Sequence, residues 1–466
     1  MAEEIELKLL IQPEDHQHLA AYLQRWAGVP SVKHLKNIYF DTPALDLNQH
    51  KTALRLRHSS SGWVQTLKTS GASQGVLSHR GEWETPVDGA SLMPERLPSE
   101  RLQADWLSQL QPVFSTDFTR TSWALALTHP DYGVGSVEIC ADQGQVYVPG
   151  REGEDPISEV ELELVEGDPR LIFDALALLQ KAVSLQPGLA SKAQRGLRLF
   201  QPKALKPLDL ALSSQTLDWA GLLELAGRQL NQWIQTYEHW LFDGDEQHLE
   251  KGILALLRLQ GLLVTLQRVC PQAPLREPRI ELKRLLRAFL PLRLAREKDR
   301  MAQSLRLALP LGYEARRAEL RQLWQTAWTG QASLSLVQGL YLCRDRQPSQ
   351  PLPDGLALLQ AACAHLRFPR QPLDAKLWQQ RYPALVRLEW LAEGWPQVPV
   401  VERRRLTRLR QGIEEVMGLQ QLQQQPLLKS SERQLLDQRR ESTLLQLGRD
   451  AQALWTEGGI GAVSDE

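Results

Sequence analysis

Charged and apolar residues alternate along several short segments in the first 200 residues, and this pattern constrains the fold more than any other feature. In Glu4-Ile5-Glu6-Leu7-Lys8 every second residue is charged, and the same holds for the acids at 159, 161 and 163. Because successive side chains of a β-strand point to opposite faces, each segment predicts a strand with one apolar and one charged face. Further segments of this kind are Leu54–Arg57, Trp63–Thr69, Arg80–Thr85, Arg120–Leu127 and Gly135–Asp142, with helical patches at Pro13–Trp26 and Pro169–Ala182 between the segments.

The charges on these faces come in blocks of one sign, such as Arg55 with Arg57. An ordinary solvated face is one explanation, but like charges along one face repel each other, and such faces more commonly mix both signs. The alternative is a site, because converging carboxylates bind hard cations such as Mg²⁺ and Mn²⁺, and converging Lys and Arg bind phosphate oxygens. Together these groups match what phosphoryl transfer requires, which is positioning and charge neutralisation.

Beyond about residue 200 the apolar residues recur at helical spacing, as in Leu223, Ala226, Leu230 and Trp233. This spacing predicts amphipathic helices. A chain of 466 residues is also longer than one hydrophobic core usually supports. We therefore expect an α+β multidomain protein, with a β-rich domain at 1–200, a linker at 201–215, an all-α helical bundle at 216–456 and a disordered tail at 457–466.

The composition gives no global charge signal. The 54 Lys and Arg nearly balance the 55 Asp and Glu, and a net charge of −1 favours neither nucleic acid nor a membrane as partner. The four cysteines form no C-x-x-C pair, which gives little support to a zinc or redox site. The acidic start Met1-Ala2-Glu3-Glu4 argues against a signal peptide, and no stretch approaches the about 20 apolar residues that span a bilayer, so a cytoplasmic protein is expected.

The segment Glu4-Ile5-Glu6-Leu7-Lys8 reads as an E-x-E-x-K motif, and further motifs follow it in a fixed order. They are Tyr39–Pro43, Leu54–Arg57, Leu67–Thr69, Arg80–Glu84, Arg120, Val137–Ile139 with Asp142, Glu159–Glu163, and Ser191-Lys192. With this ordered set, residues 1–200 resemble the CYTH, or triphosphate tunnel metalloenzyme, family. The resemblance implies an eight-stranded antiparallel β-barrel whose charged strand faces point inward and form a tunnel.

The resemblance also implies roles for single residues. The acids Glu4, Glu6, Glu161 and Glu163 would hold a catalytic Mg²⁺ or Mn²⁺, and Glu138 and Asp142 are further acids for a second metal or for water. The cations Lys8, Arg55, Arg57, Lys68, Arg80, Arg120 and Lys192 would line the tunnel and bind the triphosphate. The candidates for a direct part in the chemistry are Lys8, Glu82 and Glu84, the two acids by orienting the attacking water.

The helical half resembles the CHAD domain, a helical module that binds polyphosphate in other members. His248, Arg293–Asp299, Arg381–Trp390 and Leu406–Leu419 follow the order of its motifs. The candidates for contact with polyphosphate are therefore His248, Arg293 and Arg296. The helix after His248 has few basic residues where the family has many. The alternatives are that His248 is a capping or surface histidine, that the basic clusters elsewhere are solvated faces paired with nearby Glu, and that the bundle only braces the barrel.

The function expected from this resemblance is divalent-metal-dependent hydrolysis of inorganic triphosphate to diphosphate and phosphate. The preference for inorganic triphosphate rests on the two-domain arrangement, which resembles that of the bacterial inorganic triphosphatases. Two alternatives stay open at this point. One is a polyphosphate-binding protein with minor hydrolysis. The other is a nucleotide or thiamine triphosphatase, or an adenylate cyclase, of the same family.

Overall fold

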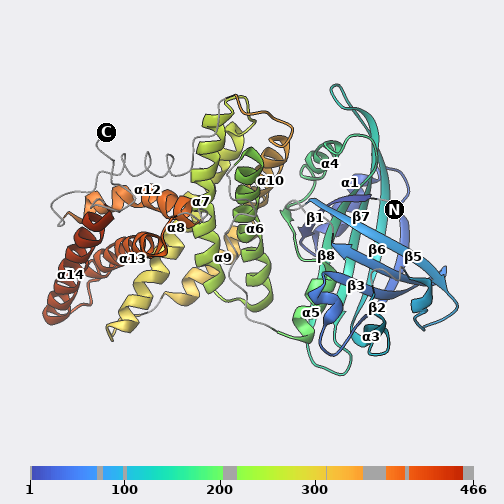
Figure 1. Cartoon of the computed structure of the whole chain (residues 1–466), viewed down its shortest axis with the longest axis horizontal. Coiled ribbons are helices and arrows are strands. Elements are labelled where there is room, and N and C mark those ends of the chain that lie inside the picture. The colour runs from blue at the N-terminus through green and yellow to red at the C-terminus, as the bar shows by residue number, and fades with distance from the viewer. Residues whose placement is uncertain are drawn as a thin grey trace. The chain divides into compact units, whose positions relative to one another are not determined.

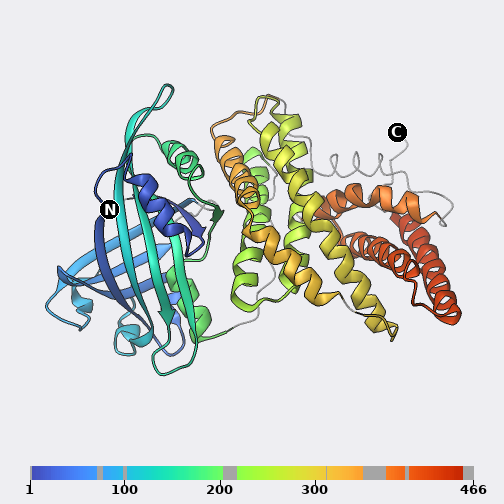
Figure 2. The ribbon, with the colours of Figure 1, turned by 180° about the vertical axis from the view of Figure 1, so that it is seen from behind.

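The computed structural model describes residues 3–70, 77–97, 102–202, 218–310, 312–349, 374–393 and 398–454. The chain divides into two compact units, which Figures 1 and 2 show from opposite sides. The sheet unit comprises Met1–Pro207, Leu241–Asp243 and Thr326–Leu334, and the helical unit comprises Leu208–Trp240, Gly244–Gln325 and Ser335–Glu466. The predicted domain limits stay predictions, because most of the linker and the whole tail at 457–466 lie outside the described residues.

The sheet unit contains one antiparallel sheet whose strands follow the order β5-β4-β3-β2-β6-β7-β8-β1-β9. All seven segments with alternating charges fall within strands, which confirms this part of the interpretation. The expected number of eight strands is wrong, because a ninth strand, β9, pairs with the end of β1. The strands are β1 (Glu3–Ile11), β2 (Ser31–Asp41), β3 (Thr52–Ser59), β4 (Gly62–Ser70), β5 (Leu77–Val87), β6 (Gln111–His129), β7 (Gly133–Tyr147), β8 (Glu154–Glu166) and β9 (Leu185–Pro187).

The two ends of this strand order meet at β1, which pairs with β8 and also with β5. The contact with β5 joins only Glu3–Leu7 to Leu77–Gly81. From Leu9 to Ile11, β9 takes the place of β5 beside β1. The expected closed barrel therefore requires correction: the sheet does not close along its full length, because β5 and the short β9 share one edge of β1.

The apolar strand faces form the core of the sheet unit, as the alternation predicts. Leu7, Leu54 and Leu162 are fully buried, and helix α4 (Leu171–Leu179) packs on β6, β7 and β8. A second apolar cluster joins Tyr39, Phe114 and further residues of β2, β6, β7 and β8 to helix α5. The other helices of this unit are α1 (Asp15–Leu23), α2 (Asp46–Gln49) and α3 (Ala104–Leu107).

Helix α5 (Lys192–Phe200) begins with a capping box and is packed closely on β6. The Ser191 side chain accepts a hydrogen bond from the Gln194 amide, and the Gln194 side chain accepts one from the Ser191 amide. A Cβ added at Gly196 would lie 2.0 Å from the Phe114 ring, so no larger residue fits there. The start of α5, and with it the position of Lys192, is therefore fixed by hydrogen bonds and by close packing.

The helical unit confirms the prediction of a helical C-terminal part. Its core includes Trp233, Tyr237, Phe289 and Trp324, whose rings lie within 4.9 Å of a neighbouring ring centroid. In the described part of the chain, no helix is long and apolar enough to cross a membrane. The helices are α6 (Trp219–Asp243), α7 (Gln247–Val269), α8 (Arg276–Ser304), α9 (Tyr313–Gln325), α10 (Ala327–Leu342), α12 (Ala375–Glu393), α13 (Val400–Gln423) and α14 (Ser430–Leu454), of which α6 and α10 each contribute residues to both units.

Candidate active site

A cavity of about 590 Å³ lies in the sheet unit, on the charged faces of the strands. The alternation explains this arrangement, because residues at every second position of β1, β3, β5, β6 and β8 reach the same space. Its charged lining among the described side chains is Glu6, Lys8, Lys51, Arg55, Arg57, Lys68, Glu82, Glu84, Arg120, Glu161, Glu163 and Lys192. The structure thus brings together most of the residues that the sequence singles out.

Three acids at one wall of the cavity could hold a metal ion. Glu6 of β1 lies opposite Glu163 in the strand register, and Glu161 is the next residue of β8 on the same face. Each acid offers a carboxylate oxygen, and these atoms lie within 4.8 Å of one another. An all-oxygen donor set suits a hard divalent cation such as Mg²⁺ or Mn²⁺. The side chain of Glu4, the fourth predicted ligand, lies outside the described residues.

Two buried lysines neutralise the acids of β8. The Lys8 ammonium donates hydrogen bonds to Glu159, at 2.9 Å, and to Glu161. The Lys192 ammonium forms ion pairs with Glu159 and, at 3.3 Å, with Glu161. Burial by itself would raise the pKa of Glu159, but Lys192 and Lys8 lower this pKa to about 2. Against the same effect of burial, Lys192, Lys8 and Arg120 hold the pKa of Glu161 well below its usual range.

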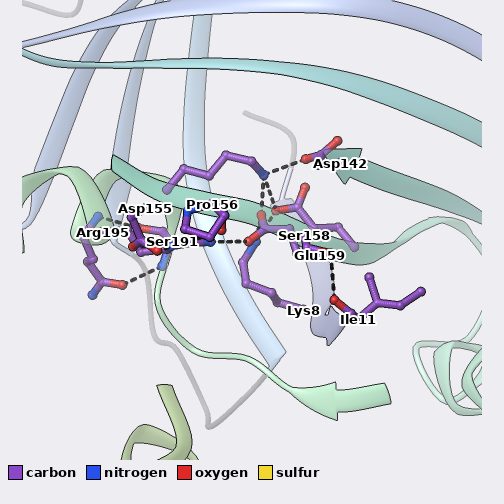
Figure 3. Close-up of polar contacts among 12 residues, drawn as sticks. Lys8, Ile11, Asp142, Asp155, Pro156, Ser158, Glu159, Ser191 and Arg195 are labelled. Atoms are coloured by element: carbon purple, nitrogen blue, oxygen red, sulfur yellow. Dashed lines mark hydrogen bonds and ion pairs between the residues drawn. The ribbon is translucent and has the colours of Figure 1, made fainter. Parts of the chain in front are cut away.

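Arg120 connects this acidic wall to β7. Its guanidinium donates two hydrogen bonds to Asp142, at 2.8 and 2.7 Å, and a third to Glu161. Asp142 is fully buried and also pairs with Lys192 at 2.6 Å. It is absent from the described cavity lining, and its carboxylate could hold an ion together with those of Glu159 and Glu161. Figure 3 shows Asp142, Glu159 and Lys8 converging on this cluster.

Glu138, the other acid predicted for a second metal, lies further along β7. Its strand partner is Glu163, and its carboxylate, that of Glu163 and the Cys140 thiol could together hold an ion. Cys140 is buried, and this burial raises the pKa of its thiol to about 12. Glu138 itself is absent from the described lining of the cavity.

The lining on β3, β4 and β5 carries further cations, among them Arg55, Arg57 and Lys68. Lys68 pairs with Glu82 at 2.9 Å, and Arg55 lies 3.4 Å from the same carboxylate. Arg57 lies 3.9 Å from the Glu84 carboxylate. Burial and the neighbouring Arg55 lower the pKa of Arg57 to about 10. A buried cation whose charge is disfavoured in this way is stabilised by an incoming anion.

Several lining residues were not predicted from the sequence. Tyr39 is buried and also lines the cavity, where its hydroxyl accepts a hydrogen bond from Arg55 at 3.5 Å. Phe118 lies under the Lys192 ammonium, 4.9 Å from the ring centroid to the nitrogen. Phe118 lies two residues before Arg120 on β6, so the period of two could have placed it, whereas the sequence of β2 gives no such signal for Tyr39. The backbone of Arg80 pairs with Glu4 and Ser70, but its side chain lies outside the described residues.

The residues predicted to contact polyphosphate in the helical unit are already paired with acids or rings. Arg293 is buried and donates hydrogen bonds to Glu414, at 2.6 Å, and to the Tyr382 hydroxyl. Arg296 donates a hydrogen bond to Glu250 at 2.6 Å. The His248 ring lies 5.2 Å from the ring of His239. Polyphosphate binding by these residues stays a prediction.

Comparison with known proteins places a family match on the sheet unit. Residues 2–197, which are less than half of the chain, match the family model described as the CYTH domain. An inorganic triphosphatase of Haemophilus influenzae is 36% identical over 207 residues, which are 42% of this chain and 54% of that protein. The chain thus spans about half the length of this curated relative. The resemblance of the helical half to the CHAD domain stays a prediction.

Two solved structures are similar over the same part of the chain. One is a proposed adenylyl cyclase from Hippeastrum, described as having a dominant triphosphatase activity, with 23% identity and a TM-score of 0.33 over 43% of this chain and 97% of that one. The other is a proposed adenylate cyclase from Bacillus halodurans, with 21% identity and a TM-score of 0.28 over 42% of this chain and 98% of that one. At these scores neither structure adds to a functional assignment.

Proposed function

We propose that the sheet unit hydrolyses inorganic triphosphate to diphosphate and phosphate with the help of a divalent metal, Mg²⁺ or Mn²⁺. The observation that carries this proposal is a single cavity whose lining joins three clustered carboxylates to Arg55, Arg57 and Lys68. The similarity to an inorganic triphosphatase supports the choice of substrate. The arrangement matches phosphoryl transfer, in which the protein positions the phosphates and neutralises their charge.

Glu6, Glu161 and Glu163 would hold the metal, since their oxygens lie close enough to bind one ion. When bound, such an ion withdraws charge from phosphate oxygens and lowers the pKa of an attacking water. Arg55, Arg57 and Lys68 would contact phosphate oxygens, and an anion beside Arg57 would remove the penalty of burying its charge. Glu4 and Arg80 keep their predicted roles as hypotheses, as does Glu138.

The acids of β5 would act on the phosphate-binding cations and on water. Glu82 accepts contacts from both Lys68 and Arg55, so it fixes the direction in which these two side chains extend. Glu84 accepts a hydrogen bond from Thr66 at 3.2 Å and lies beside Arg57. Lys8 and Lys192, which are shared between Glu159 and Glu161, place two ammonium groups next to the proposed metal ligands. We assign the orientation of the attacking water to Glu82 or Glu84.

Phosphate release tests this proposal. Inorganic triphosphate, ATP and thiamine triphosphate are each incubated with the full chain in Mg²⁺, Mn²⁺ or EDTA. Rapid release that EDTA abolishes, with the highest kcat/KM for inorganic triphosphate, is the expected result. A higher kcat/KM for ATP or thiamine triphosphate, or formation of cyclic AMP, would reassign the substrate within the same cavity. Tight binding of triphosphate or polyphosphate without turnover would instead make the cavity a binding site.

A pair of variants on β8 tests the metal assignment. Glu163→Gln removes a proposed ligand, whereas Glu166→Gln changes an exposed acid on the same strand. We expect Glu163→Gln to lose turnover and to weaken Mn²⁺ binding to the free protein, while Glu166→Gln keeps both. Unchanged Mn²⁺ affinity in Glu163→Gln contradicts the assignment.

A further inference from the structure

Arg195 lies one turn after Lys192 on α5 and points to the same wall of the sheet unit, but it is absent from the described cavity lining. Its guanidinium is buried and donates two hydrogen bonds to Asp155 of β8, at 2.9 and 2.7 Å. It donates another to the Pro156 carbonyl at 2.5 Å. Figure 3 shows Arg195 beside Asp155 and Pro156, away from the labelled Lys8 and Asp142. This two-point contact fixes the orientation of the guanidinium relative to β8.

The same guanidinium also reaches Glu159, at 3.4 Å from Nη1 to Oε2. Glu159 is fully buried, and its other oxygen, Oε1, accepts hydrogen bonds from Lys8 and Lys192. Arg195 and Lys192 therefore hold opposite oxygens of one carboxylate. The carboxylate cannot rotate toward one partner without loosening its contact with the other.

Lys192 depends on these neighbours for its position. A lysine ammonium is a point charge on a flexible stem, so its location is set by the groups that accept its hydrogen bonds. For Lys192 these groups are Glu159, Asp142 and Glu161, all buried and the first two fully so. Asp142 is in turn held by Arg120, whereas Glu159 is held from behind by Arg195.

We propose that Arg195 is a positioning residue that acts through Glu159 to hold the Lys192 ammonium at the cavity wall, an inference that rests on the proposed triphosphate hydrolysis. Arg195 itself contacts no substrate. Its contribution is preorganisation, because the ammonium is already in place when the anion arrives. A misplacement of about 1 Å in such a group can cost about 10²-fold in rate.

A purely structural role is the competing explanation, since Arg195 also ties α5 to β8 through Asp155. A double-mutant cycle separates the two roles. The proteins are wild type, Arg195→Gln, Lys192→Gln and the double variant, each as the full chain with Mn²⁺ and inorganic triphosphate. The control is Arg198→Gln. Arg198 lies on the same helix and also pairs with Asp155, at 3.1 Å, whereas the hydrogen bond to Glu159 at 3.4 Å is donated by Arg195.

If Arg195 acts through Lys192, Arg195→Gln lowers kcat/KM by about 10²-fold in the wild-type background and by less than about threefold in Lys192→Gln. The Mn²⁺ affinity of Arg195→Gln without triphosphate stays close to that of the wild type, as does the kcat/KM of Arg198→Gln. Multiplicative effects of the two substitutions overturn the inference and leave a structural role. Should Arg195→Gln not fold, Arg195→Lys keeps the charge but loses the two-point contact, and the same cycle is run with it. If the wild-type protein does not hydrolyse triphosphate at all, the proposed function itself is refuted. This outcome differs from that of an active enzyme in which the effects of the two substitutions are multiplicative.

Discussion

Replacing Glu161 by glutamine should cost the sheet unit stability as well as activity. The Glu161 carboxylate is buried and accepts contacts from Lys8, Arg120 and Lys192. The amide that replaces it is neutral and presents N–H groups to some of these cations. Removing one partner from a buried ionic cluster costs about 3–5 kcal/mol. We expect the lower end, about 3 kcal/mol, because Lys8 keeps Glu159 and both Lys192 and Arg120 keep Asp142.

A loss of about 3 kcal/mol corresponds to a fall of about 6–12 °C in the Tm of a unit of this size. Calorimetry of the full chain measures it, and Glu166→Gln is the control because this exposed acid lies on the same strand. Phosphate release and Mn²⁺ titration are measured on the same samples, and both should fall sharply for Glu161→Gln alone. Equal Tm values for the two variants would refute the reasoning about the ionic cluster. Full turnover in Glu161→Gln would refute its role as a metal ligand.

Three further predictions follow from other charged groups. The pKa of Glu159 is lowered from 4.5 to about 2, so the contribution of this group to stability is present above pH 4.5 and is lost as the pH falls toward 2. In Glu159→Gln, the free energy of unfolding should therefore depend less on pH over this range than in the wild type. Arg57→Gln should leave the Tm unchanged or higher, because the Arg57 charge is disfavoured by burial, yet raise the KM for triphosphate about tenfold or more through the loss of a charge-assisted hydrogen bond. Glu414→Gln leaves Arg293 and Arg410 without their shared carboxylate and should destabilise the helical unit by about 3–5 kcal/mol. Circular dichroism during denaturation measures this loss, and an unchanged free energy of unfolding would mean that the cluster does not contribute to stability.

The charged strand faces were predictable because a period of two is a local property. Their inward direction came from the resemblance to a known family. Strand β2 was missed, since residues 31–34 are all exposed and show no alternation of burial. The three-residue β9 is too short to carry a periodic pattern and exists because β1 offers it an edge. Pairing across the sheet was likewise outside the reach of pattern analysis.

Among the site residues, Glu6, Lys8 and Glu161 could be picked out by type and spacing, but their neutralisation could not. Whether a carboxylate faces a metal or a lysine depends on which strands become neighbours. Asp142 illustrates this, because its predicted role with a second metal or with water stays a prediction, while the structure pairs its buried carboxylate with Arg120 and Lys192. Arg195 carried a weak local signal, being on the same helix face as Lys192. Its partner Asp155 is 40 residues away in sequence, so spacing alone could not reveal the pair.

The position of β1 also determines the order in which the sheet unit can fold. Each partner of β1 in the described sheet is distant in sequence, and the Lys8–Glu161 contact spans 153 residues. Strand β1, which precedes the other strands of this sheet in the chain, therefore stays unpaired until β5, β8 and finally β9 have been synthesised. Pairings of such long range slow folding, because the entropy of closing the loop is lost before any contact forms. During synthesis, β1 is consequently the strand of this unit most exposed to wrong partners, and a nascent chain cut before β8 has no means of completing the sheet.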